Sequence, residues 1–589
     1  MKRAETENNE QPMRDAFFEA KDLRSGCAEC DTHKRRGPSR RGPSGCGKTT
    51  LLDMLAAKKT SPYSGKVFLN GRPRDRLFPR VTSYVPHQDV MPPYWTVAEA
   101  VEFNHRLRID AHNMPDETRR AFCGELLALF GLLDVKDSII GDERVRGISS
   151  GQRRRVTLAR GYVGGAQVVF ADEPTSGLSA TDAETCMRAI AGTSRVRGVT
   201  FVVVIHQPRV EVAAMFDHLT LMTSHPGRVV YNGPFSEVKG YFTAAGCAPP
   251  PDTGNPADFY LDVITPGTRG SKADEFVDRY LRGQKEDVDA AVNAMIAVGG
   301  KSPLEVLEDT RVMRAKWFEE RTVKDSVYSV PWATQITTLM RRRLALTLRD
   351  KTMLKTRMIV SLMQGTIVGI AFLDIGKKLP VQQISFLFML LQMGALSNMV
   401  VMPEMIAQRL VLKFENSDAL YSIHAAVFVD TLVNNTLAIA GNFVTSIIMY
   451  SLSGLSWNTF DTLYFWSFMC FMTMTNFFKV IAAVAPSAQS ALQTAMPGLM
   501  LFILFNNFFV NQATAPFFMK WALYVSPMAW GIEQIVMGIY GADPTLVTLY
   551  GYDASSEHTI KALAVLITEI CFFQLLSLAC LRYFNNISR

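Results

Sequence analysis

Six long apolar runs occupy the C-terminal half of the chain, and they constrain its fold more than any other feature of the sequence. Each run is long enough to approach or cross the hydrocarbon core of a bilayer as a helix. The runs are Met358–Leu373, Ile384–Met402, Ala425–Leu452, Leu463–Ala485, Leu492–Val510 and Ile560–Leu581. One such run could be a buried helix of a soluble protein, but six in succession without a charged face exclude that fold. The sequence therefore predicts an all-α domain with six transmembrane helices.

Basic residues flank these runs and predict how the chain is oriented. The cluster Arg341–Arg343 precedes the first run, together with Arg349 and Lys355. Because positive residues stay on the cytosolic side of a membrane, we predict a multi-pass integral membrane protein with its N-terminal domain and both termini in the cytosol. The plasma membrane is favoured over an internal membrane. Such flanking residues account for the net charge of +7 and give no reason to expect nucleic acid as a partner.

The first part of the chain has the pattern of an α/β domain. With 589 residues the protein is too long for one core. Candidate strands at Val67–Leu69, Val168–Ala171 and Thr200–Ile205 alternate with helical patterns, and the last two are apolar runs typical of strands buried on both faces. We predict a disordered tail at residues 1–40, an α/β domain at 41–265, a charged linker at 266–330, and at 331–589 a connecting helix with the transmembrane domain.

A glycine-rich segment at the start of the α/β domain has the pattern G-x-x-x-x-G-K-[ST], which wraps backbone N–H groups around nucleotide phosphates. It consists of Gly42, Pro43, Ser44, Gly45, Cys46, Gly47, Lys48 and Thr49, and Thr50 continues into the predicted helix. Lys48 supplies positive charge to the β- and γ-phosphates, and the Thr49 hydroxyl is a ligand for Mg²⁺. The segment predicts a nucleotide site; the alternative is a Gly/Ser turn that contains a lysine by chance.

Further polar residues follow in an order that suits nucleotide hydrolysis. Asp172 and Glu173 end an apolar strand, where the first can hold Mg²⁺ and the second can polarise the attacking water. The alternative is a pair of acids that solvate a loop. Between the two motifs, the turn Gly147–Gly151 leads into a basic helix whose first N–H groups form an anion site. Gln88 and His206 complete the set.

In order and spacing these segments resemble the ATP-binding cassette (ABC) transporters. The resemblance implies that ATP and Mg²⁺ are the cofactors and that the glycine-rich segment is the Walker A loop. It also implies that Asp172 and Glu173 are the Walker B pair, that Gln88 senses Mg²⁺ opposite the membrane domain, and that His206 contacts the γ-phosphate. We therefore expect an ABC-type transporter ATPase, built as an α/β P-loop NTPase cassette followed by a six-helix membrane domain.

The segment Ser149–Gln152 is similar to the signature of the same family, with Ser149, Gly151 and Gln152 as candidate contacts to ATP. In this family each ATP lies between one chain's Walker A loop and another chain's signature. The resemblance therefore implies a homodimer, or a heterodimer with another half-transporter. Domain order places the chain nearest the G subfamily, the white and pleiotropic-drug-resistance type, which three further stretches also resemble: Gly227–Pro234, Asn255–Asp262 and Ser526–Trp530.

Four features depart from the family pattern. The residues before Gly42 are basic and contain no apolar strand, so we expect the first strands of the cassette to be missing. Ser150 replaces the first glycine of the signature pair, and Ser179 replaces an aspartate that links the two ATP sites. The expected outer loop from about Asn511 to His558 contains no cysteine, so the disulfides of some animal relatives cannot form there.

Two functions remain open from the sequence. The first is ATP-driven export of a hydrophobic or amphipathic compound, such as a lipid, sterol or xenobiotic, by a dimeric half-transporter. The alternative is a catalytically impaired partner subunit of a heterodimeric ABC transporter, which Ser150 and Ser179 favour and which Lys48, Glu173 and His206 oppose. A soluble ATPase that acts on nucleic acid is excluded by the apolar runs.

Overall fold

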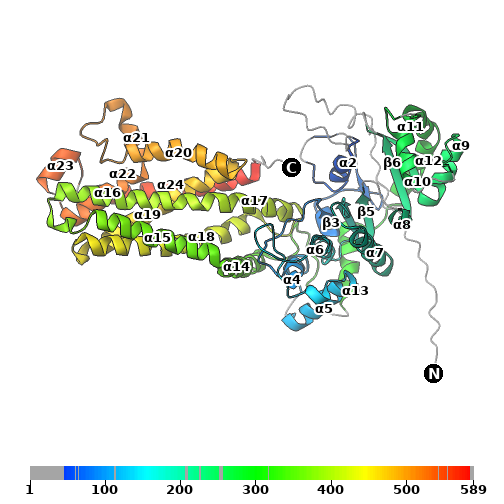
Figure 1. Ribbon diagram of the computed structural model, residues 1–589, viewed down its shortest axis with the longest axis horizontal. Helices are drawn as coiled ribbons and strands as arrows, with labels where there is room; N and C mark the ends of the chain where they lie inside the picture. Colours follow the sequence, from blue (N-terminus) through cyan, green and yellow to red (C-terminus); the bar gives the residue numbers. More distant parts are fainter. Residues whose placement is uncertain are drawn as a thin grey trace. The chain divides into compact units, whose positions relative to one another are not determined.

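The chain folds into two units, one α/β and one helical (Figure 1). The structure is a computed structural model that describes residues 46–59, 62–63, 65–111, 114–205, 210–223, 227–250, 256–268, 270–315, 318–541, 543–553 and 555–583. The α/β unit takes residues up to Pro331 together with Ser417–Leu420, and the helical unit takes Trp332–Asn416 and the residues from Tyr421 onward. The predicted order of an α/β domain followed by an all-α membrane domain is confirmed. The predicted tail at residues 1–40 lies outside the described residues.

A sheet of three parallel strands carries the candidate site. The strands are β3 (Thr82–Val85), β4 (Val168–Asp172) and β5 (Thr200–Val204), in the spatial order β3-β4-β5. Asp172 lies opposite Val204, so the carboxyl ends of these strands meet at one edge, which is where open α/β sheets bind ligands. The helices of this part are α2 (Lys48–Leu55), α3 (Phe78–Val81), α4 (Val97–Arg108), α5 (Asp116–Leu129), α6 (Ser150–Tyr162), α7 (Ala180–Arg197) and α8 (Val210–Ala213).

Burial differs between the strands of this sheet. Every residue of β4 is buried, as its apolar sequence predicts. The sequence also predicts that β5 is buried on both faces, but all of its residues are only half-buried. That prediction is wrong because, among the described residues, β5 lies at the edge of the sheet and pairs with β4 alone. β3 is not among the predicted strands, since it is short and begins with two hydroxyl residues.

Two antiparallel hairpins complete the α/β unit. β1 (Phe68–Leu69) pairs with β2 (Arg72–Pro73), and β6 (His218–Thr223) pairs with β7 (Arg228–Pro234). The second hairpin shares an aromatic core with the helices that follow it, in which Tyr231, Phe242 and Phe276 are fully buried. Phe276 belongs to the segment interpreted from the sequence as a charged linker, and this part of the segment contributes to a core. The helices are α9 (Val238–Ala244), α10 (Pro256–Ile264), α11 (Ala273–Arg282), α12 (Gln284–Val298) and α13 (Pro303–Arg314).

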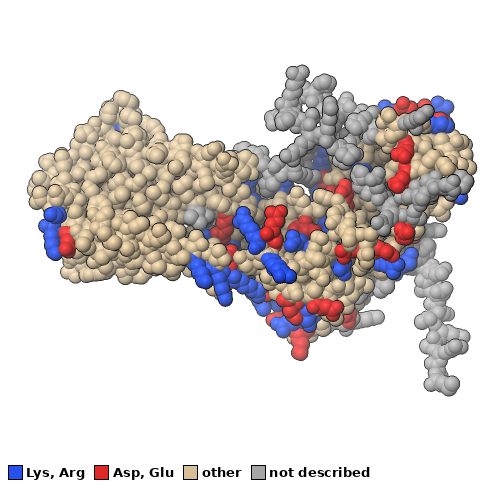
Figure 2. Space-filling view, in the orientation of Figure 1, with Lys and Arg blue, Asp and Glu red and all other residues tan. Residues whose placement is uncertain are grey.

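The helical unit contains five segments, among the described residues, that are long and apolar enough to span a membrane. They are Lys351–Lys377, Pro380–Ser417, Ile423–Ser453, Trp457–Val484 and Ser556–Tyr583. On the face shown in Figure 2, Lys, Arg, Asp and Glu gather on the α/β unit and are sparse on the helical unit. The helices are α14 (Trp332–Arg349), α15 (Lys351–Ala371), α16 (Pro380–Ser397), α17 (Val401–Ser417), α18 (Ile423–Ser453), α19 (Phe460–Val484), α20 (Ala488–Leu504), α21 (Lys520–Val525), α22 (Pro527–Tyr540), α23 (Pro544–Tyr550) and α24 (Ser556–Tyr583).

Five of the six predicted apolar runs correspond to these long helices of the described chain, and the run Leu492–Val510 corresponds to a shorter apolar helix. α20 has 17 residues and ends at Leu504. Directly after it, the side-chain oxygen of Asn506 accepts hydrogen bonds from the N–H groups of the next two phenylalanines, at 2.9 and 3.0 Å. Asn507 adopts a left-handed backbone conformation with φ of 61°. Asparagine competes with helix formation through such local bonds, and here the bonds of Asn506 follow directly on the end of α20.

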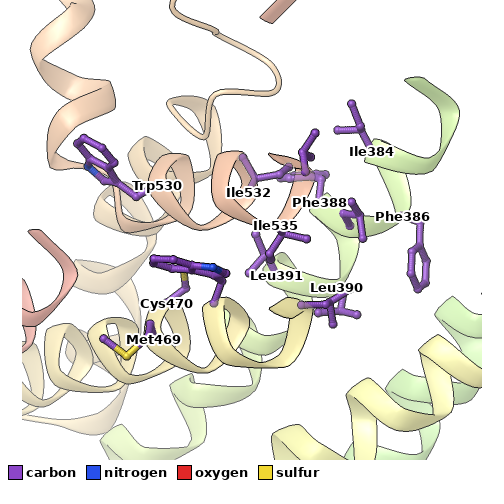
Figure 3. Close-up of a cluster of buried hydrophobic side chains, with 14 of the residues drawn as sticks. Ile384, Phe386, Phe388, Leu390, Leu391, Met469, Cys470, Trp530, Ile532 and Ile535 are labelled. Atoms are coloured by element: carbon purple, nitrogen blue, oxygen red, sulfur yellow. The ribbon is translucent and has the colours of Figure 1, made fainter. Parts of the chain in front are cut away.

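The sequence predicts an outer loop from about Asn511 to His558. In the structure this stretch contains α21, α22 and α23. In α22 all ten residues Pro527–Val536 are buried. Gly531 allows α22 to approach α19, since a Cβ there would overlap the sulfur of Cys470. Figure 3 shows the resulting apolar cluster, in which α22, α16 and α19 contribute the labelled residues Trp530, Ile532, Ile535, Leu391 and Met469.

Candidate functional site

The start of α2 presents backbone donors where the glycine-rich segment predicts phosphate binding. Gly42, Pro43, Ser44, Gly45 and His206 lie outside the described residues, and Cys46, the first described residue of the segment, is buried. Gly47 precedes the helix in a left-handed conformation with φ of 84°, and no atom lies within 4 Å of the position its Cβ would take. Backbone conformation, rather than space, therefore requires glycine here. No side chain caps α2 in the described structure, so the N–H groups of Lys48, Thr49 and Thr50 remain available to an anion.

The two predicted Mg²⁺ ligands of the motifs meet, although 123 positions separate them in the chain. The Thr49 hydroxyl donates a hydrogen bond to Oδ1 of Asp172 at 3.0 Å. A hydroxyl and a carboxylate oxygen on adjacent rigid elements are the oxygen donors that Mg²⁺ takes from a protein when substrate phosphates complete its shell. These residues therefore fit the cation. ATP would supply the phosphate oxygens, and Lys48 would lie beside them in the first turn of α2.

Electrostatics at this pair favour a bound cation. Burial raises the pKa of the Asp172 carboxyl above its ordinary value, the hydrogen bond from Thr49 opposes that shift, and the negative charge of Glu173 adds to it. A divalent cation beside the carboxylate would reverse the balance, because it stabilises the ionised form.

Glu173 follows β4 in a conformation that few residues adopt. Its φ is 47°, in the left-handed region, and its N–H donates to the carbonyl of Val204 at 2.9 Å. Strained backbone of this kind persists where the surroundings over-determine it, and it concentrates at functional sites. The Glu173 carboxylate lies 3.6 Å from Nδ1 of His87. The sequence analysis missed His87; its only signal was its place beside the candidate Gln88.

Gln88 lies in the exposed loop that follows β3, and its side chain makes no hydrogen bond with Thr49 or Asp172 in the described structure. Its backbone carbonyl accepts a bond from the N–H of Val90. The fold therefore brings the loop of Gln88 to the carboxyl edge of the sheet. Its role at the metal stays a prediction.

The signature segment forms the first turn of α6. Ser149 caps the helix through its side-chain oxygen, which accepts from the N–H of Gln152 at 3.1 Å, and the Gln152 amide oxygen accepts from the N–H of Ser149 at 3.0 Å. Gly151 packs against α7, where an added Cβ would lie 2.6 Å from Cγ of Asp182. Ser179 caps α7 and its hydroxyl donates to the Asp182 carboxylate at 2.7 Å. Position 179 therefore serves as a helix cap.

No hydrogen bond or ion pair between described residues links Ser149, Gly151 or Gln152 to the first turn of α2. The structure thus brings together Thr49, Asp172 and Glu173 but does not join the signature to them. A second residue that the sequence analysis missed, Arg154, lies one turn into α6 and bonds to both strand ends. The local sequence pattern does not distinguish it from its neighbours, since it is the middle one of three consecutive arginines.

Two segments of the chain match known families. Residues 41–176 match the family described as ABC transporter. Residues 334–540 match the family described as ABC-2 type transporter, and residues 206–281 match a second family with the same description. These segments include the glycine-rich loop, the paired acids and most of the helical unit.

The chain is also similar to curated proteins along most of its length. ABC transporter G family member 34 of Arabidopsis thaliana is 28% identical over 536 residues, which are 88% of this chain and 35% of the relative. ABC transporter G family member 2 of Dictyostelium discoideum is 29% identical over 513 residues, 84% of this chain and 37% of the relative. ABC transporter G family member 34 of Oryza sativa subsp. japonica is 28% identical over 515 residues, which are 85% of this chain and 34% of the relative. This chain spans little more than a third of the length of these relatives.

Proposed function

Because the chain belongs to the G family of ABC transporters, we propose that it uses the energy of ATP hydrolysis to export a hydrophobic or amphipathic compound across a membrane. ATP and Mg²⁺ are the cofactors. A lipid, a sterol or a xenobiotic is the class of substrate, and the α/β unit faces the cytosol. The plasma membrane is favoured as the location.

The contact between Thr49 and Asp172 is the observation that carries this proposal. In it the Thr49 hydroxyl at the start of α2 lies 3.0 Å from the Asp172 carboxylate at the end of β4, and we assign both groups as ligands of Mg²⁺. Glu173 is the next residue, so a general base follows directly on the metal ligand. In the mechanism, Lys48 and the free N–H groups of α2 hold the phosphates, Thr49 and Asp172 hold Mg²⁺, and Glu173 takes a proton from the attacking water.

A dimer follows from the separation of the two halves of the site. The signature on α6 is not bonded to α2 within the described part of the chain, so we propose that it contacts ATP on a second cassette. That cassette belongs to a second copy of this chain or to another half-transporter. With ATP held between them, the two cassettes would close on each other, and the membrane helices would change the side to which they are open.

Hydrolysis is tested with Glu173→Gln in the full-length protein, reconstituted in lipid vesicles. The variant should keep its affinity for ATP and lose turnover by about 10²-fold, the scale for removal of a general base. Glu184→Gln is the matched control, since Glu184 is a half-buried acid on α7 whose ion-pair partner among the described residues is Arg188, one turn away. ATPase activity is measured with and without a panel of hydrophobic compounds. Wild-type turnover in Glu173→Gln would refute the assigned base. Wild-type protein that hydrolyses ATP only after mixing with another half-transporter would identify a partner subunit.

A further inference from the structure

One buried arginine joins three segments of the α/β unit. Arg154 lies on α6, one turn after the signature, and its side chain is only 3% exposed. Its neighbours in sequence face elsewhere: Arg155, for example, donates to the carbonyls of Phe130 and Gly131 at 3.0 and 3.1 Å. A guanidinium in such a position is costly unless hydrogen-bond acceptors surround it. The acceptors of Arg154 therefore indicate which segments its side chain holds in place.

Arg154 donates to two carbonyls of the loop that carries Gln88. Nη1 lies 2.6 Å from the carbonyl oxygen of Pro86 and 3.2 Å from that of His87. The same nitrogen lies 3.0 Å from Oδ1 of Asp89, which also accepts from the Thr157 hydroxyl at 2.8 Å. Pro86 and His87, the first two residues after β3, and Asp89 are thus held by α6.

The other side of the guanidinium donates to the backbone around Glu173. Nη2 lies 2.7 Å from the carbonyl oxygen of Asp172, and Nε lies 3.3 Å from that of Pro174. These carbonyls flank the residue with the left-handed conformation. Because such a conformation is maintained only by its surroundings, the two bonds fix the direction in which the Glu173 carboxylate points.

We propose that Arg154 is the positioning residue of the hydrolytic site, which sets the Glu173 carboxylate and the Gln88 loop against the signature helix. Arginine is required because its planar fork reaches acceptors on both sides, whereas the ammonium group of lysine is a single point charge. The phosphate-binding helix α2 makes none of these contacts, so ATP binding should depend on Arg154 much less than hydrolysis does. The inference rests on the proposed hydrolysis of ATP.

The experiment compares Arg154→Met and Arg154→Lys with the control Arg155→Met, each in the full-length protein reconstituted in vesicles. Both Arg154 variants should lose about 10²-fold in kcat, the scale of a small misplacement of catalytic groups, while their Kd for a fluorescent ATP analogue stays within about threefold. Hydrogen exchange should rise at residues 87–89 and at Asp172 and Glu173, the residues of these two segments that carry an amide N–H. The control should retain wild-type kcat and exchange.

Each result separates positioning from a general structural role. A wild-type kcat in either Arg154 variant would overturn the proposal, and so would a parallel loss of ATP affinity and thermal stability. If Arg154→Met does not fold, Arg154→Lys decides, because it keeps the charge and the length but not the fork. Absence of ATPase activity in the wild-type protein would instead refute the proposed function on which the inference rests.

Discussion

Replacement of His105 by phenylalanine should abolish one pH-dependent part of the stability of the α/β unit. His105 lies on α4, is 0% exposed, and stacks edge-on against Phe122 and Phe318 with ring centroids 5.2 and 5.8 Å away. Neither ring nitrogen has a hydrogen-bond partner among the described residues. Burial, together with the positive charges of Arg119 and two further arginines nearby, lowers the pKa of His105 to about 3.

The sign and size of the effect follow from that pKa. The unfolded chain, with a pKa near 6.5, binds the proton before the folded protein does, so the contribution of His105 is complete above about pH 6.5 and is lost as the pH falls. Between pH 7.5 and pH 5 the difference is about 1.5 logarithmic units, or about 2 kcal/mol. Phenylalanine cannot bind the proton, and any steric cost of its larger ring is the same at both pH values.

Hydrogen exchange of α4 in the full-length protein measures this difference. Corrected for intrinsic rates, wild-type protection should fall by about 30-fold more than that of His105→Phe between pH 7.5 and pH 5. Phe103→Leu, at a buried site of the same helix against Trp95, should reduce protection equally at both pH values and is the control. Equal pH dependence in wild type and His105→Phe would refute the reasoning, because it would show that the imidazole is not a neutral, buried group.

The remaining predictions concern the candidate site. Lys48→Ala should abolish ATP-dependent transport with normal membrane insertion, because it removes the charge on the phosphates and no apolar contact; retained vesicle transport at matched expression would contradict this. Because burial raises the pKa of Asp172 above its ordinary value, affinity for Mg-ATP should fall as this carboxyl is protonated at acid pH, and calorimetry of Asp172→Asn should show weaker binding with a smaller pH dependence than the wild type. In mixed dimers, Lys48→Ala on one chain with Gly151→Asp on the other should leave one site intact, whereas both changes on one chain should spoil both. Equal ATPase activity of the two arrangements, or an active monomer, would argue against shared sites.

Much of the candidate site could be predicted because its functional residues lie in short contiguous segments of the sequence. Lys48 and Thr49 start a helix after a glycine with positive φ, and Asp172 ends an apolar strand, so both positions follow from local pattern. The contact of Thr49 with Asp172 follows once the strands are parallel, since their carboxyl ends meet at one edge. Arg154 could not be found in this way, because its acceptors come from residues 86–89 and 172–174, and the choice among three consecutive arginines depends on which face of α6 packs inward.

The sequence by itself determined the division into an α/β unit and a membrane unit. The length of an apolar run and the periodicity of its apolar residues are local properties, and they decide whether a segment can span a bilayer or form a helix. Only the tertiary structure decided three other features. Among the described residues β5 is an edge strand despite its apolar sequence, α20 ends at Leu504 before Asn506, and α22 packs in the helical core beside Cys470. An apolar residue is buried only where another element covers it, and an asparagine ends a helix only where its side chain finds backbone partners. These three features depend on contacts between segments that are distant in the chain, and a local sequence pattern does not predict such contacts.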